Sequence, residues 1–173
     1  MDLIDSTGFL IGLLRLGCVL KSSGSPSHLE LMLTPLEKVI AGLKDAVKLE
    51  KSSLKVAMRQ DKQRGVYTTR PFRKGQFVAE YAGEFVTMAE SLRRENEYQL
   101  NGEGCYILNI SKEEAVDASR YFHRIGRLIN HASSNPNLKL HRPLTIDGKK
   151  QVPFVALRDI HIGEELFFDY GIR

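Results

Sequence analysis

The apolar positions near residue 40 follow a helical pattern. They lie three or four residues apart, at Leu36, Val39, Ile40, Leu43 and Val47. A capping-box signature precedes them, with Thr34 three residues before Glu37 and a proline at the first helical position. We therefore predict an amphipathic helix over about 35–51 that docks its apolar face on the domain that follows it.

From residue 65 onward, short apolar runs alternate with turn residues, which is typical of strands. A second capping box at Thr87 and Glu90 predicts a short charged helix that ends near Tyr98. The compact apolar stretch 125–130 is either a short helix or a turn. Predicted strands lie at 66–69, 76–81, 85–86, 105–110, 115–118, 152–157 and in a closing segment at 163–171. This succession predicts an α+β domain that is mainly β, rather than a doubly wound sheet.

The first 33 residues have a different texture. An apolar run at 8–20 falls short of the roughly 20 residues that cross a bilayer, and Arg15 interrupts it. Acidic residues precede the run, which is wrong for a secretory signal. We read it as a buried or partner-facing segment, or as an unstructured end. Small polar residues with glycine and proline at 21–28 indicate a linker.

Composition narrows the class of protein. A hydrophobic fraction of 42% is enough for a folded core, so disorder of the whole chain is excluded. The net charge of +4 has two readings, a preference for an acidic partner such as nucleic acid or a nucleosome, or ordinary solubility charge. Cys18 and Cys105 share no motif and the histidines lack ligand spacing, so we expect no disulfide framework, no metal site and a reducing intracellular compartment.

Common catalytic signatures are absent from the sequence, including G-x-S-x-G, a P-loop, HExxH and a Rossmann glycine motif. Two other features remain. Phe168 and Tyr170 lie two apart in a predicted strand, so they share one face and Asp169 takes the other. Such an aromatic pair either binds a cationic or amine ligand or simply packs in the core. The Asn130-His131 pair is either a structural anchor or a ligand clamp, because buried polar groups need hydrogen-bond partners.

Four segments together resemble the SET domain of protein lysine methyltransferases, over about residues 62–173. They occur in the family's order as Arg64-Gly65-Val66, Glu80-Tyr81-Ala82-Gly83-Glu84, Arg127-Leu128-Ile129-Asn130-His131 with Asn135-Pro136-Asn137, and the closing Gly163–Gly171. Within the family, Gly104-Cys105-Tyr106, Val116–Arg120 and the lack of zinc cysteines are most similar to the branch that monomethylates the histone-four tail on nucleosomes. Four ordered motifs are far more specific than any one of them.

The resemblance implies a SET fold of small curved sheets, preceded by the amphipathic N-terminal helix. In this fold the closing segment threads under the loop around Asn130-His131 and forms a C-terminal pseudoknot, an exception to the rule against threaded chains. The implied organisation is an uncharacterised segment and linker over 1–33, a helix and lead-in over 34–61, and a SET-like catalytic domain over 62–173.

The resemblance also implies the site residues. S-adenosylmethionine, the methyl donor, would lie against Lys62, Gln63 and Arg64, with Tyr106, Asn130 and His131 completing its site. The target lysine would enter from the opposite side, through a channel lined by Tyr81, Cys105, Phe168 and Tyr170. Tyr170 would orient the amine or stabilise the transferring methyl, and Tyr81 would bond the amine or order a water near it. No metal takes part.

The implied activity is methyl transfer to a protein lysine, on a histone tail in nucleosomes or on a non-histone protein. The implied setting is nuclear chromatin, with nucleic acid contacted only as nucleosomal DNA and with no membrane. One alternative is a catalytically weak or inactive SET-fold protein that interacts with chromatin. A third reading is a chromatin-binding module that uses its basic surface, with binding that weakens steeply as salt rises.

The chain departs from the family pattern at three places. Gln63 stands where the family often has glycine, so a side chain there crowds the donor. Phe168 stands where the monomethylating relatives have tyrosine, whose hydroxyl holds a water, and this predicts room for a second methyl group. The chain stops at Ile172-Arg173, so we expect no post-SET tail over the site. Three readings follow: the sequence is incomplete, the activity is weak, or another chain covers the site.

Overall fold

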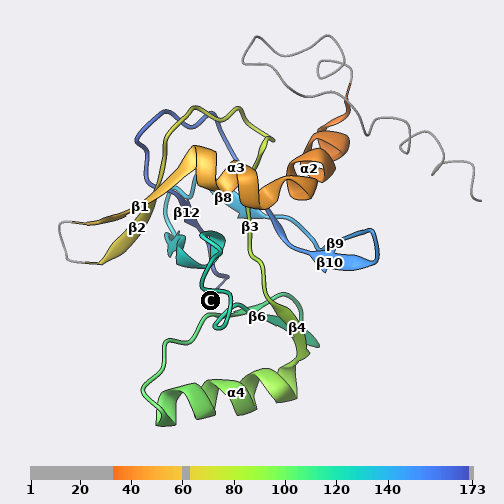
Figure 1. The fold of residues 1–173 in the computed structure, drawn as a ribbon, viewed down its shortest axis with the longest axis vertical. Coiled ribbons are helices and arrows are strands. Elements are labelled where there is room, and N and C mark those ends of the chain that lie inside the picture. The colour runs from red at the N-terminus through yellow and green to blue at the C-terminus, as the bar shows by residue number, and fades with distance from the viewer. Residues whose placement is uncertain (1–32, 60–62, 172–173) are drawn as a thin grey trace, which may run out of the picture. The chain divides into compact units, whose positions relative to one another are not determined.

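The structure is a computed structural model that describes residues 33–59 and 63–171 (Figure 1). The apolar run at 8–20 and the linker at 21–28 lie outside the described residues, so both interpretations stay predictions. Within the described part of the chain, no helix is long and apolar enough to cross a membrane.

The helix predicted over 35–51 is two helices, α2 (Pro35–Lys44) and α3 (Ala46–Ser53). Its predicted start is confirmed: the Thr34 hydroxyl accepts a bond from the Glu37 N–H, and the Glu37 carboxylate accepts one from the Thr34 N–H. The predicted continuity is wrong, because Asp45 leaves helical geometry with φ −108° and ψ 18°. Leu36, in the first turn of α2, and Val47, beyond the break, were both expected on the apolar face, yet they are 44% and 43% exposed.

Close packing holds α2 on the main sheet. Val39, Leu43 and Ala46 form a small cluster with Phe77 and Val155, which belong to strands of that sheet. Gly42 lies inside this contact: a Cβ atom there would come within 2.5 Å of the Phe77 ring. The backbone of α2 can approach the sheet this closely only where the side chain is a hydrogen atom.

The described chain is mainly β, with several small sheets, as the sequence predicted. A five-stranded sheet pairs its strands in the order β3 (Phe77–Glu80), β11 (Pro153–Ala156), β8 (Leu138–Leu140), β12 (Phe167–Phe168) and β7 (Asn130–His131). Three smaller sheets pair β1 (Leu54–Met58) with β2 (Arg64–Thr68), β9 (Leu144–Ile146) with β10 (Lys149–Gln151), and β6 (Glu114–Asp117) with β4 (Glu84–Thr87) and β5 (Ile107–Asn109). The helix α4 (Met88–Leu100) lies beside β4 and β6, on the far side from α2 (Figure 1).

The closing segment is threaded through the chain. β12 lies between β7 and β8 and runs parallel to both, and the loop 132–137 joins those two strands across it. Of the strand predicted at 163–171, only the two residues of β12 pair with β7 and β8. The pairing with β7 is short because β7 is itself two residues long. The loop is bonded to the threaded strand at both ends, by Ala132 N–H to the Phe168 carbonyl at 3.1 Å and by Asn137 N–H to the Phe167 carbonyl at 3.2 Å. This arrangement is the expected pseudoknot.

One buried amide fastens the threaded segment. Asn137 is 2% exposed; its Nδ2 donates to the Glu165 carbonyl at 2.7 Å and its Oδ1 accepts the Phe167 N–H at 2.8 Å. The side chain therefore stands in for a strand backbone, since it offers a donor and an acceptor to alternate peptide groups. Without it, two backbone groups would be buried without partners.

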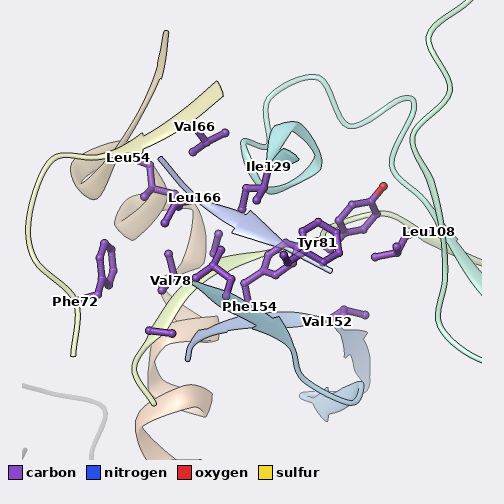
Figure 2. Close-up of a cluster of buried hydrophobic side chains, with 14 of the residues drawn as sticks. Leu54, Val66, Phe72, Val78, Tyr81, Leu108, Ile129, Val152, Phe154 and Leu166 are labelled. Carbon is purple, nitrogen blue, oxygen red and sulfur yellow. The ribbon is translucent and has the colours of Figure 1, made fainter. Parts of the chain in front are cut away.

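The main hydrophobic core runs under the candidate site. Figure 2 shows Phe154 at its centre, with Tyr81 at the edge towards Leu108. The Phe154 ring meets the Tyr81 ring edge-on at 6.2 Å between centroids and the Phe168 ring at 4.7 Å. Two of the predicted channel aromatics thus take their orientation from the same buried ring.

A buried charge cluster joins α3 to the main sheet. Arg124 Nη2 donates to Glu50 Oε1 at 2.7 Å and to Glu80 Oε2 at 2.8 Å, and all three residues are less than 9% exposed. Glu50 also accepts the backbone N–H groups of Glu80 and Ile125. The cluster therefore links a helix, a strand and the segment that leads into the site.

Replacing Arg124 tests this cluster. Arg124→Met leaves two carboxylates buried without a cation, so we expect the free energy of unfolding to fall by about 3–5 kcal/mol. Denaturant unfolding followed by circular dichroism measures the change. The matched control is Arg73→Met, which breaks a 2.9 Å bond to Asp159 at the surface and should change stability by less than about 1 kcal/mol. Equal losses of stability in the two variants would show that the buried cluster contributes no more than a surface ion pair.

Candidate functional site

A cavity of about 290 Å³ opens beside the threaded segment. Its wall is formed by Gln63, Arg64, Tyr81, Cys105, Tyr106, Ile107, Leu108, Arg127, Leu128, Ile129, Asn130, Phe168 and Tyr170. All of the predicted site residues are among them except Lys62, which lies outside the described residues, and His131. Segments distant in sequence, from β2, β3 and β12, meet here and bring aromatic, amide and cationic groups into one space.

A larger open groove of about 790 Å³ lies along α3. It contains none of the predicted site residues. Its charged groups are surface lysines such as Lys48 and the carboxylate-paired Arg124. We therefore take the smaller cavity, where mixed chemistry converges, as the candidate site.

One end of the cavity is aromatic. The rings of Phe168 and Tyr170 lie 4.5 Å apart between centroids, as their two-residue spacing predicted. Phe168 is 2% exposed and packs in the core, so the core-packing reading is observed for it, and binding of an amine ligand stays a prediction. Tyr170 is 39% exposed and lines the cavity.

Two phenol hydroxyls at this end are held by backbone carbonyls. Tyr81 donates to the Tyr106 carbonyl and Tyr170 to the Ile129 carbonyl, each at 2.9 Å. Burial raises the pKa of Tyr81 and of Tyr170, so both phenols are neutral near pH 7. Since each proton is already donated, the phenol oxygens present lone pairs that can accept bonds from an amine. Neither group is suited to act as a general base.

His131 supports Tyr170 from outside the cavity. Its Nδ1 accepts the Tyr170 backbone N–H at 3.1 Å, and the two rings lie 5.0 Å apart between centroids. An acceptor at Nδ1 places the proton of a neutral imidazole on Nε2. The observed contacts of His131 are thus with Tyr170, the candidate catalytic residue. Its predicted role in binding the methyl donor stays a prediction.

The Asn130 side chain ties three segments together. Its Nδ2 donates to the Arg64 carbonyl at 2.8 Å and to Glu165 Oε1 at 3.1 Å. Glu165 belongs to the threaded segment and also accepts bonds from Arg59 and Tyr67. Of the two roles that the sequence left open, the structural anchor is observed. Contact with a ligand through the remaining Oδ1 or the backbone stays a prediction.

The other end of the cavity is cationic. Arg64 donates to the Tyr106 hydroxyl at 3.0 Å. The Arg127 guanidinium stacks on the Tyr106 ring at 4.2 Å and on the Phe122 ring at 5.3 Å. Arg127 is only 9% exposed, yet among the described residues no acceptor bonds its Nε or Nη1. Arg127 also lines the cavity, so its guanidinium is a candidate partner for an anionic group such as a carboxylate.

Arg127 was not predicted from the sequence to be a site residue. It was noted only as the first residue of the motif that ends in Asn130-His131. Its position depends on Gly126, where a Cβ atom would come within 2.0 Å of the Glu80 carbonyl. The 3₁₀ turn η1 (Gly126–Leu128) can therefore press against β3. The signal in the sequence was a charged residue between a glycine and the apolar Leu128-Ile129, a place where a cation is buried.

Cys105 lines the cavity beside the aromatic end. Burial raises the pKa of its thiol, so it stays uncharged near pH 7 and is not an activated nucleophile. Among the residues that the structure describes, no group of three or more histidine, cysteine or acidic side chains could hold a metal ion.

Comparison with known proteins agrees with this geometry. The family model described as "SET domain" matches residues 63–171. The chain belongs to the SET-domain family. The match includes every described residue that lines the candidate site, from Gln63 to Tyr170.

Relatives in the family are similar over most of the chain. The N-lysine methyltransferase KMT5A of Xenopus tropicalis is 41% identical over 129 residues, covering 72% of this chain and 38% of that protein. The histone-lysine N-methyltransferase Set8 of Drosophila melanogaster is 36% identical, covering 79% and 20%. The crystal structure of CpSET8 from Cryptosporidium has a TM-score of 0.61 and 35% identity, covering 68% of this chain and 57% of that one. The chain spans less than two fifths of the length of these two curated relatives.

The unpaired donors of Arg127 make a prediction about stability. Arg127→Met removes two buried donors that lack protein partners, which relieves a desolvation cost of about 1–3 kcal/mol. The free energy of unfolding of the ligand-free protein should therefore stay the same or rise. Denaturant unfolding beside Arg124→Met, the paired arginine three positions earlier, gives the matched comparison. A loss of more than about 1 kcal/mol in Arg127→Met would mean that this side chain has a structural role instead.

Proposed function

We propose that this chain is a protein lysine methyltransferase whose catalytic domain covers about 62–173 and that transfers a methyl group from S-adenosylmethionine to a lysine of a histone tail. One observation carries the proposal. A single cavity is lined by neutral, lone-pair-bearing phenols and by a guanidinium with unpaired donors. A reaction between an amine and a carboxylate-bearing donor needs both kinds of group.

The residues present fit the methyl donor. Arg127 stacks on the Tyr106 ring and has two buried donors that no described residue accepts, and Arg64 bonds the hydroxyl of the same tyrosine. These groups would hold the donor's carboxylate. Gln63 and the Asn130 segment would line the rest of its site, as the family resemblance implies. When bound, the donor supplies a methyl group on a positively charged sulfur, which leaves with the S–C bonding electrons.

The aromatic end would prepare the lysine. A channel of Tyr81, Phe168 and Tyr170 lowers the pKa of a buried lysine, because burial disfavours the charged form. The neutral amine is the species that attacks. The two phenol oxygens would accept its N–H bonds and so direct its lone pair towards the methyl carbon. Since both phenols keep their protons near neutral pH, the proton lost by the lysine goes to solvent before attack.

The substrate and setting follow from the relatives. Several are named as histone-lysine methyltransferases, and the chain shares its family and its site-lining segment with them. We propose the nucleosome in nuclear chromatin as the working substrate, with nucleic acid contacted only as nucleosomal DNA. The +4 net charge is consistent with an acidic particle of that kind. A non-histone protein substrate is the alternative.

Methyl transfer to nucleosomes tests the proposal. Wild-type protein should move labelled methyl groups from S-adenosylmethionine to a histone, and Tyr170→Phe should lower kcat by roughly 10²-fold, because the amine loses one of its orienting oxygens. The donor Kd should change less than about twofold, since the phenol lies at the other end of the cavity. The matched control is Tyr121→Phe, outside the cavity wall, which should keep full activity.

Two outcomes contradict this proposal in different ways. No transfer by wild type to nucleosomes or to free histones, together with no donor binding by calorimetry, would favour a SET-fold protein that only interacts with chromatin. Transfer that survives unchanged in Tyr170→Phe would leave the enzyme but remove this phenol from its mechanism. The activity of wild type and of Tyr170→Phe should rise as the pH rises through neutrality, because the substrate lysine loses its proton. Neither Tyr81 nor Tyr170 loses its own proton near neutral pH.

Phe168 leads to a prediction about the product. Its side chain has no hydroxyl, so it cannot fix a water in the space that a methylated amine needs. We expect wild-type protein to add a second methyl group and Phe168→Tyr to stop at one. Mass spectrometry of a methylated histone peptide after long incubation measures the ratio. A strictly monomethylated product from wild type would refute it, and Phe85→Tyr, in β4 and outside the cavity wall, controls for a general effect of an added hydroxyl.

A further inference from the structure

One buried carboxylate bonds two side chains of α4. Asp117, at the end of β6, is 3% exposed. Its Oδ2 accepts the Tyr98 hydroxyl at 2.8 Å and Arg94 Nη1 at 3.0 Å, both from α4. Burial alone would raise the pKa of Asp117, but bonds from Ser119, Arg94 and Tyr98 outweigh it and hold the pKa below its usual value. The group is therefore ionised and fully bonded near pH 7.

The other oxygen of Asp117 leads towards the cavity. Its Oδ1 accepts the Ser119 N–H at 2.9 Å, and the Ser119 hydroxyl accepts the Tyr106 N–H at 3.0 Å. The Tyr106 carbonyl in turn accepts two bonds at 2.9 Å, from the Ala118 N–H and from the Tyr81 hydroxyl. An unbroken series of hydrogen bonds thus runs from α4 to a phenol of the candidate site.

The series bonds both backbone groups of Tyr106. Residues 103–105, just before it, lie outside any strand or helix and are exposed. The Tyr106 ring lines the cavity and is held separately, by Arg64, by Arg127 and by the core. The bonds of its N–H and carbonyl to 118–119 therefore set where the backbone of this wall lies and where the carbonyl points.

We propose that Asp117 and Ser119 are positioning residues for methyl transfer. They fix the Tyr106 backbone, and the Tyr106 carbonyl then orients the Tyr81 hydroxyl towards the amine. This inference rests on the function proposed above and goes beyond it, because neither residue lines the cavity. A displacement of about 1 Å at a reacting group can slow an enzyme roughly 10²-fold, so a small shift of this wall is enough to matter.

Ser119 gives the sharpest test. Ser119→Ala removes the acceptor for the Tyr106 N–H and leaves the cavity wall chemically unchanged. We expect kcat on nucleosomes to fall by about ten- to 100-fold, with the donor Kd within roughly threefold of wild type. The Tyr106 amide should exchange with deuterated solvent at least about tenfold faster, because its protecting bond is lost. Ser119→Thr keeps the hydroxyl and should restore both the rate and the protection.

Two neighbouring arginines of α4 provide a matched pair. Arg94→Gln removes a bond to Asp117 together with bonds to Glu84 and Glu90, whereas Arg93→Gln removes only surface bonds to Glu90 and Glu97. Only the Arg94 variant should lower kcat and speed exchange at Tyr106. Thermal unfolding of each variant confirms that the whole domain stays folded, so a local effect is separated from global loss.

Each other outcome has a definite meaning. Wild-type kcat in Ser119→Ala, or slower transfer without faster exchange at Tyr106, would overturn the positioning role alone. Equal effects of Arg93→Gln and Arg94→Gln would overturn the part assigned to Asp117. Failure of wild type to transfer methyl groups would overturn the proposed function, and the positioning role would fall with it.

Discussion

The insertion of β12 between β7 and β8 is the constraint on which the candidate site depends. Phe168 and Tyr170 reach the cavity only because the closing segment passes under the loop 132–137. Several contacts that hold them there cross this junction, including the Tyr170 hydroxyl on the Ile129 carbonyl and the Asn137 amide on the segment backbone. The site is thus a product of topology more than of any local motif.

Two arginines close in sequence show how the same side chain serves structure and function. Arg124 is buried between two carboxylates, which satisfies its charge and fastens α3 to the main sheet. Arg127 is buried just as deeply on two aromatic rings, with donors that no described residue accepts. A ligand that completed its bonding would remove this cost, and the contrast supports the binding site proposed for the cavity.

The sequence predicted the class of fold, the start of α2 and most of the longer strands, because each depends on local spacing. It missed β8, β9 and β10, since each is three residues long and includes polar residues such as Lys139 and Lys149. It also missed the five-residue β1, which follows directly on α3 and lies in the predicted helix and lead-in over 34–61. It also missed the break at Asp45, where tertiary packing overrides a continuous helical pattern.

The residues of the candidate site could be predicted from the sequence mainly through motifs. Eight predicted residues do line one cavity, yet the roles of Asn137 and Arg127 were not visible. Asn137 bonds backbone groups about thirty positions away, and the importance of Arg127 lies in partners that it does not have. No pattern of neighbouring residues records either fact, because both depend on long-range packing.

The threaded strand also decides when the site comes into existence during synthesis. A ribosome delivers β7 and β8 well before Phe167, and at that moment these strands lack the neighbour that each needs. The loop 132–137 must stay open, or reopen, to admit the last segment, which makes closure a late and non-local step. A nascent chain would therefore hold both halves of the cavity without the Tyr170 phenol between them, and substrate could engage a finished site only after residues 165–171 had left the ribosome.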